Sequence, residues 1–185
     1  CGFGNLPVAQ HLVSLGADVD PDALRRASEE GHLEVVKYLM RLGVDIAYRE
    51  YEALRLACYR GRFAAVKYLG EVGAGVTACA SGPLDWAVMT NRLEIVRFLL
   101  SRGTRIPASY NSVKYAVEGG YIEVLKLLVD SGIVGIACKY YISIAIRRGH
   151  SELAIYLLSL RRDFNAIALI SHDLAVRHNL PRVVQ

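Results

Sequence analysis

The sequence has no long hydrophobic run. Its 185 residues contain no stretch that approaches the roughly 18 consecutive apolar residues of a membrane-spanning helix, and the apolar segment from Val8 to Leu15 is interrupted by Gln10 and His11. We therefore expect no membrane anchor.

Cysteine is scarce, and its spacing excludes the usual chemistry of paired thiols. The four cysteines are Cys1, Cys58, Cys79 and Cys138, with no CxxC pair and no histidine at metal-ligand spacing. An N-glycosylation sequon and a signal-like start are also missing. We expect free thiols in an intracellular protein, cytoplasmic or nuclear and including the compartments of a host cell.

Motifs for catalysis are missing as well. No HExxH, Walker-loop or nucleophile-elbow pattern occurs. His32 and His150 occupy one repeat position, and each lacks convergent partners, which favours a hydrogen-bonding role at a helix start over metal or acid–base chemistry. We expect no catalytic residue, no cofactor and no bound metal.

What the sequence does have is a regular pattern of alanines, each followed four residues later by a turn residue. The alanines are Ala27, Ala57, Ala87, Ala116 and Ala145, and the turn residues are Gly31, Gly61, Asn91, Gly120 and Gly149. The steps between alanines are 30, 30, 29 and 29 residues. A fixed period of about 20 to 50 residues is typical of a solenoid of stacked repeats.

Residues 23–46 show what one repeat contains. Two short helices are joined by Glu-Gly-His, and Leu33, Val36, Leu39 and Met40 form an apolar stripe along the second helix. Helices this short do not persist alone in water, so they must stack on their neighbours. The alanine is small because two helix layers approach closely there.

Several copies carry a family resemblance. The segments 31–39, 91–100 and 120–128 resemble the second helix of ankyrin repeats, and residues 22–27 and 82–87 keep part of the family's first-helix signature. The period is shorter than the family's usual 33 residues. This short-finger type resembles the large ankyrin arrays of giant DNA viruses of amoebae, and arrays of protists and intracellular bacteria are similar.

The resemblance implies an all-α fold, an ankyrin-repeat solenoid of stacked helix-turn-helix units with short or trimmed β-turn fingers. We expect one ankyrin-repeat domain over residues 1–185. Its parts are a partial repeat at 1–20, repeats at 21–50, 51–80, 81–109, 110–138 and 139–168, and a partial or degenerate repeat at 169–185. Both ends interrupt a repeat, which favours a longer parent chain.

Partners of ankyrin proteins usually lie against the concave face made by the fingers and first helices. The two residues that precede each turn residue belong to that face, and in this chain they share almost nothing while the second helices nearly repeat. Such variation on a uniform scaffold is typical of a recognition surface, although drift at exposed positions would produce it too.

Aromatic residues, methionine and arginine are enriched at binding hot spots, and they guide the choice of candidate residues. We predict that the partner-binding residues are Tyr48, Arg49, Tyr51, Tyr59, Arg60, Met89, Thr90, Tyr110, Glu118, Arg147 and Arg148. Acidic residues cluster between Asp18 and Glu30, whereas Lys139, Arg147 and Arg148 make the last repeat basic.

These features predict a monomeric, non-catalytic scaffold that binds another protein. The alternative is that the chain recruits the substrate of a larger ubiquitin-ligase adaptor or enzyme, whose catalytic or F-box-like module lies outside it. Nucleic-acid binding by the basic end is disfavoured because the dense basic stripe and interleaved aromatic residues of such binders are missing.

Overall fold

A computed structural model describes residues 4–73, 82–104, 111–132 and 139–160, and all regular structure in these ranges is helical. The chain divides into two compact units, residues 1–107 and 108–185. Unit 1 contains helices α1 (Leu6–Ser14), α2 (Pro21–Glu30), α3 (Leu33–Arg41), α4 (Tyr48–Arg60), α5 (Phe63–Glu71), α6 (Pro83–Met89) and α7 (Leu93–Ser101). Unit 2 contains helices α8 (Asn111–Gly119), α9 (Ile122–Asp130), α10 (Lys139–Arg147) and α11 (Ser151–Ser159).

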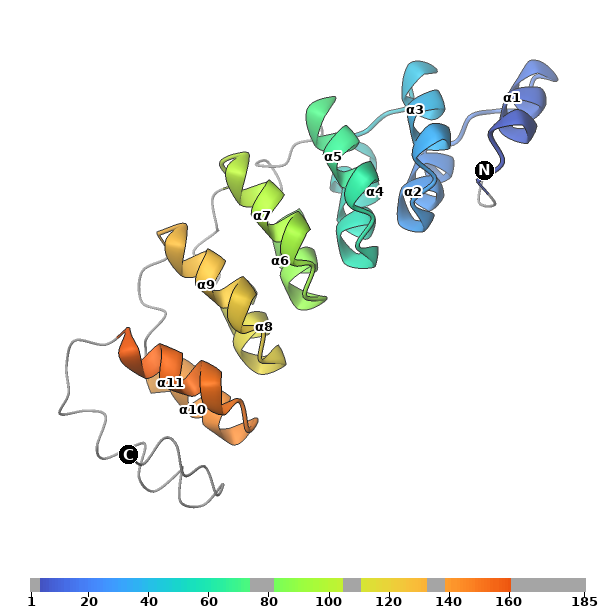
Figure 1. Cartoon of the computed structure of the whole chain (residues 1–185). Coiled ribbons are helices and arrows are strands. Elements are labelled where there is room, and N and C mark those ends of the chain that lie inside the picture. The colour runs from blue at the N-terminus through green and yellow to red at the C-terminus, as the bar shows by residue number, and fades with distance from the viewer. Residues whose placement is uncertain (1–3, 74–81, 105–110, 133–138, 161–185) are drawn as a thin grey trace. The chain divides into compact units, whose positions relative to one another are not determined.

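The helices of each unit pair and stack as the repeat predicts (Figure 1). In unit 1 the first helices α2, α4 and α6 contact one another in order, and the second helices α3, α5 and α7 do the same. In unit 2 the first helices α8 and α10 contact each other, and α9 and α11 pack on them. The all-α repeat fold expected from the sequence is therefore confirmed.

The periodic alanines lie where the two layers meet. Ala27, Ala57, Ala87, Ala116 and Ala145 are all completely buried. They share the interior with one apolar stripe per second helix, of which Val36 and Leu39 in α3 are examples, each at most 1% exposed. A methyl group is the largest side chain that fits at such a close approach without separating the layers.

One hydrogen-bonded turn links the two helices of every repeat. The carbonyl oxygen of each periodic alanine accepts from the amide five residues later, at N···O distances between 2.8 and 2.9 Å. This closure needs a left-handed residue between the helices. Gly31 supplies it with φ +83°, and Asn91, the one turn residue among the five that is not glycine, adopts φ +56°.

Within each unit, the residue after a turn packs against the turn glycine of the preceding repeat. A Cβ atom added to Gly31 would lie 2.8 Å from Cδ of Arg62, and one added to Gly120 would lie 2.7 Å from Nδ1 of His150. The ring Nε2 of His150 is also 3.0 Å from the carbonyl oxygen of Glu118. The hydrogen-bonding role expected for His150 is thus confirmed, and it joins two repeats.

Helix α4 begins in an unusual way. Arg49, Glu50 and Tyr51 have φ values of +48°, +56° and +60°, so the first turn of the helix is left-handed. Each non-glycine residue in this conformation costs about 1 to 2 kcal/mol. The first turn of α4 therefore holds backbone strain.

Cys58 lies in the interior of unit 1 as a free thiol and is completely buried. Burial raises the pKa of this thiol far above its ordinary value, because the thiolate would lose its hydration. The expectations for Cys1, Cys79 and Cys138 fall outside the described residues. Among the helices in the described ranges, none is long and apolar enough to cross a membrane.

Candidate functional site

The variable residues predicted for binding lie in the last turn of each first helix or just beyond it. Tyr59 and Arg60 end α4, Met89 ends α6, and Thr90 is the residue that follows α6. All four are partly or fully exposed, although the alanine two residues before each pair is completely buried. We call this surface of unit 1, formed by the ends of α2, α4 and α6, the first-helix face.

Charges on the first-helix face are paired with one another. The guanidinium of Arg60 donates to Oε1 of Glu29 on α2 through Nη2 at 2.7 Å and through Nε at 3.1 Å. This hydrogen bond raises the pKa of Arg60 above its ordinary value. Arg25 lies 3.6 Å from the other oxygen of Glu29, and Arg62 lies 3.6 Å from Glu30. The acidic cluster near the first complete repeat is therefore largely neutralised within unit 1.

The aromatic residues of this face also contact one another. The rings of Tyr59 and Trp86 meet edge to face, with centroids 5.4 Å apart and planes at 79°. The guanidinium carbon of Arg60 lies 5.9 Å from the centroid of the Tyr59 ring. The Thr90 hydroxyl donates to the carbonyl oxygen of Trp86 at 3.0 Å, so its proton is already used. Trp86 was missed in the sequence analysis because it lies before the variable pair.

Tyr48, Arg49 and Tyr51 lie in the strained first turn of α4 and not in a separate finger. The Arg49 guanidinium carbon is 5.2 Å from the Tyr48 ring centroid, and Nη1 of Arg49 is 3.6 Å from a carboxylate oxygen of Glu52. The backbone carbonyl of Arg49 accepts from Arg55 at 3.0 Å. These contacts hold the strained turn. Tyr110 lies outside the described residues.

In unit 2 three predicted residues line one hollow. We call it the basic hollow. It has a volume of about 330 Å³, and the described residues that line it are Lys114, Glu118, Tyr140, Ile144, Arg147 and Arg148. Among these lining residues Ile144 is buried, whereas Tyr140 is 55% exposed.

Lys114 was missed in the sequence analysis, although a signal for it exists. It lies two residues before Ala116, just as Arg25 and Arg55 lie two residues before Ala27 and Ala57. A comparison of charges at that fixed repeat position would therefore have placed Lys114 on the same face of the first helices as the variable pairs.

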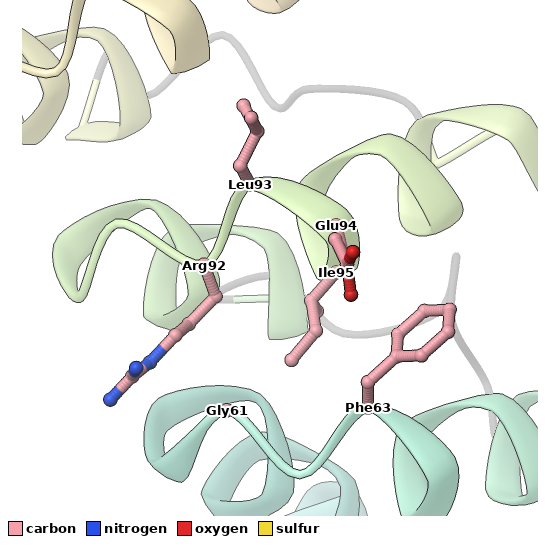
Figure 2. Close-up of a pocket in the computed structure, with 6 residues that line it drawn as sticks. All are labelled: Gly61, Phe63, Arg92, Leu93, Glu94 and Ile95. Carbon is pink, nitrogen blue, oxygen red and sulfur yellow. The ribbon is translucent and has the colours of Figure 1, made fainter.

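A second pocket of about 200 Å³ lies between the inter-helix turns of two neighbouring repeats in unit 1. Figure 2 shows the side chain of Ile95 extending toward the turn that contains Gly61, while Leu93 points away from that turn. The Arg92 side chain packs against Gly61. The edge-to-face contact of Phe63 with Phe98, with centroids 6.0 Å apart, belongs to the same packing. Its described lining has Arg92 and Glu94 as the only charged residues, beside the apolar Phe63, Leu93 and Ile95. No group of three or more potential metal ligands occurs within the described ranges.

Comparisons with known proteins agree with this architecture. A family model described as ankyrin repeats in three copies matches residues 1–80, and a model described as a single ankyrin repeat matches residues 82–112, so that the two cover more than half of the chain. A search of curated proteins found no match.

Solved structures provide the comparison of folds. The crystal structure of the human ASB11 ankyrin repeat domain superposes with a TM-score of 0.67 at 23% identity, over 76% of this chain and 69% of that one. Ankyrin repeats generally serve as protein–protein interaction domains and are typically non-catalytic. The matched repeats, the buried alanines and the stacked helix pairs together show that the chain belongs to the ankyrin-repeat family.

Proposed function

We propose that the chain is a non-catalytic scaffold that binds another protein through the variable residues at the ends of its first helices. The residues are those predicted from the sequence, with Tyr59, Arg60 and Met89 on the first-helix face as anchors. The repeat borders expected from the sequence form part of this proposal.

A contrast within each repeat carries the proposal. The periodic alanines are completely buried, and the residues two and three positions later are exposed or partly exposed and form a different pair in every copy. Packing therefore restricts the residue type at the alanine position. It does not restrict the two exposed positions, which can vary with the partner that they contact. Residues on a rigid repeat scaffold that are free to vary are the usual carriers of recognition.

Contacts between neighbouring side chains support the first-helix face as the anchor. The pair of Arg60 with Glu29 and the ring contact of Tyr59 with Trp86 hold exposed side chains in defined positions. A side chain that is already ordered loses less entropy when a partner binds. Tyrosine and arginine in such positions are typical of binding hot spots.

A comparison of two matched double variants tests the proposal. Tyr59→Ala with Arg60→Ala removes a tyrosine and a cation from α4. The matched variant, Tyr68→Ala with Lys67→Ala, also removes one tyrosine and one cation, from α5 in the same repeat. Affinity capture from cell lysate, read by mass spectrometry, should lose its specific partner with the first variant and retain it with the second.

Melting curves must accompany the capture because the first variant also loses the contacts to Glu29 and Trp86. Capture is therefore carried out well below both midpoints. Equal capture by the two variants, or equal loss, would exclude the first-helix face as the binding surface.

A further inference from the structure

We infer that the basic hollow of unit 2 binds a carboxylate-rich segment of a partner protein. This inference rests on the proposed protein-binding function and names the chemistry that one part of the partner must have. The cations involved are Lys114 on α8, Arg147 at the end of α10, and Arg148 immediately after it.

The inference begins from a difference between the two units. In unit 1 the arginines near the first-helix ends are paired, as Arg60 is with Glu29 and Arg62 with Glu30. In unit 2 no ion pair within the described residues engages Lys114, Arg147 or Arg148. Three cations and the single carboxylate of Glu118 leave the described lining with a net positive charge.

Like charges held close together repel one another, and an incoming anion relieves that repulsion. A guanidinium binds a carboxylate through two parallel hydrogen bonds, which a lysine cannot do. Arg147 and Arg148 are both exposed and can reach carboxylates of a docked chain. Lys114, on the neighbouring helix, provides a point charge for a further carboxylate.

The rest of the lining favours a peptide over a small anion. Ile144 in the lining is 4% exposed, and the exposed Tyr140 is supported by an edge contact of its ring with Tyr141 at a centroid distance of 5.3 Å. An apolar or aromatic side chain can pack on these two residues while carboxylates on either side meet the cations. We therefore expect acidic residues that flank one apolar residue.

Position in the fold favours carboxylates over phosphate. Arg147 is the last residue of α10, and Glu118 lies in the last turn of α8. Helix C-termini carry partial negative charge, whereas bound phosphates typically sit at helix N-termini. Separate carboxylates spread along a peptide avoid concentrating a double charge near those carbonyl groups.

Fluorescence anisotropy of a labelled decapeptide tests the inference on the full chain. The probe has six glutamates around a central phenylalanine, and the reference peptide has glutamine in place of every glutamate. The glutamate peptide should bind at 50 mM salt and weaken at 300 mM, because added salt screens exposed charges. The glutamine peptide should bind at least tenfold more weakly.

Matched variants locate the binding. Arg147→Gln with Arg148→Gln should weaken binding of the glutamate peptide about tenfold, the effect of losing two exposed charge pairs. Lys67→Gln with Arg97→Gln removes the same net charge from exposed positions of α5 and α7 and should change binding less than twofold. Lys114→Gln provides a second variant of the hollow, and circular dichroism confirms that each variant is folded.

Three results would overturn the inference: equal binding of the glutamine peptide, an equal loss of binding with the Lys67 and Arg97 variant, or tighter binding of a ten-nucleotide oligothymidylate, which would make the hollow a nucleic-acid site.

Failure of this inference can be distinguished from failure of the proposed function. If the chain captures its partner through Tyr59 and Arg60 but does not bind the glutamate peptide, this result contradicts only the inference. A chain that binds the peptide but captures its partner independently of Tyr59 and Arg60 contradicts only the proposed function.

Discussion

Arg60 and Glu29 are 31 positions apart in the sequence, yet Nη2 of the arginine lies 2.7 Å from Oε1 of the glutamate. Arg60 is the last residue of α4, and Glu29 lies in the last turn of the neighbouring first helix α2. This pair therefore joins two repeats at the surface proposed to bind a partner. Its side chains are partly exposed, 50% for Arg60 and 20% for Glu29, so its contribution to stability is modest.

The first prediction concerns the energy of this pair. A double-mutant cycle with Glu29→Ala and Arg60→Ala should give a small favourable coupling energy in urea unfolding, and this coupling should decrease in 1 M salt because the pair is partly exposed. The control cycle pairs Glu29→Ala with Lys67→Ala on α5, for which we expect no coupling. A coupling of zero for Glu29 with Arg60 would show that the contact is not maintained in solution.

The second prediction tests the closeness of the two helix layers. Ala87→Leu should lower the free energy of unfolding by about 1 to 3 kcal/mol, because the larger side chain must separate the layers around a completely buried position. Ala64→Leu makes the same change at an exposed position of α5 and should have little effect. Similar unfolding curves for the two variants would refute the packing assigned to the periodic alanines.

The third prediction concerns the left-handed start of α4. At Glu50, where φ is +56°, the glycine variant should be more stable than the alanine variant by about 1 kcal/mol. At exposed Arg97 in α7 the order should reverse, because glycine weakens an ordinary helix by about 1 kcal/mol relative to alanine. Thermal unfolding of the four variants measures both differences. The same order at the two positions would mean that the first turn of α4 is right-handed.

The fourth prediction concerns the pH dependence that the buried thiol introduces. Because burial raises the pKa of Cys58, the folded state keeps the proton at a pH where the unfolded chain loses it. Folding is then linked to proton uptake, and stability falls as pH rises above the ordinary thiol pKa of about 8.5, by up to about 1.4 kcal/mol per pH unit.

Urea unfolding between pH 8 and pH 10.5 measures this effect as a difference between two proteins. Tyrosines, lysines and the remaining cysteines titrate in both wild type and Cys58→Ala, so their contributions cancel. The wild type should lose stability more steeply than the variant over this range. Parallel pH profiles would show that Cys58 reaches solvent in the folded protein.

The features of the fold that recur in every repeat could be predicted from the sequence. Ala27 and its equivalents, with the turn residues four positions later, define a period that is visible without alignment. The structure places the alanines in the interior and the turn residues between the helices, as expected. These positions are predictable because the same local requirement is repeated five times. A single copy of the repeat would not have been sufficient to predict these positions.

Features that depend on two neighbouring repeats, or on strain, could not be predicted in the same way. The contact of Tyr59 with Trp86 depends on how one first helix is placed against the next, which the period alone does not specify. Arg49, Glu50 and Tyr51 contain no glycine or asparagine, so no local signal indicates a left-handed turn there. The binding assignments of individual residues remain predictions because they concern a partner and not the chain itself.

Within each unit, the packing of a turn glycine against the following repeat has a direction. Arg62 packs on Gly31, Arg92 on Gly61 and His150 on Gly120. In each case a side chain of the later repeat packs on the turn glycine of the earlier repeat. A bulky substitution at a turn glycine must therefore displace the start of the second helix in the following repeat, while the preceding repeat is not touched by the new side chain. Within a unit, a substitution at a turn glycine should therefore disorder the following repeat more than the preceding one.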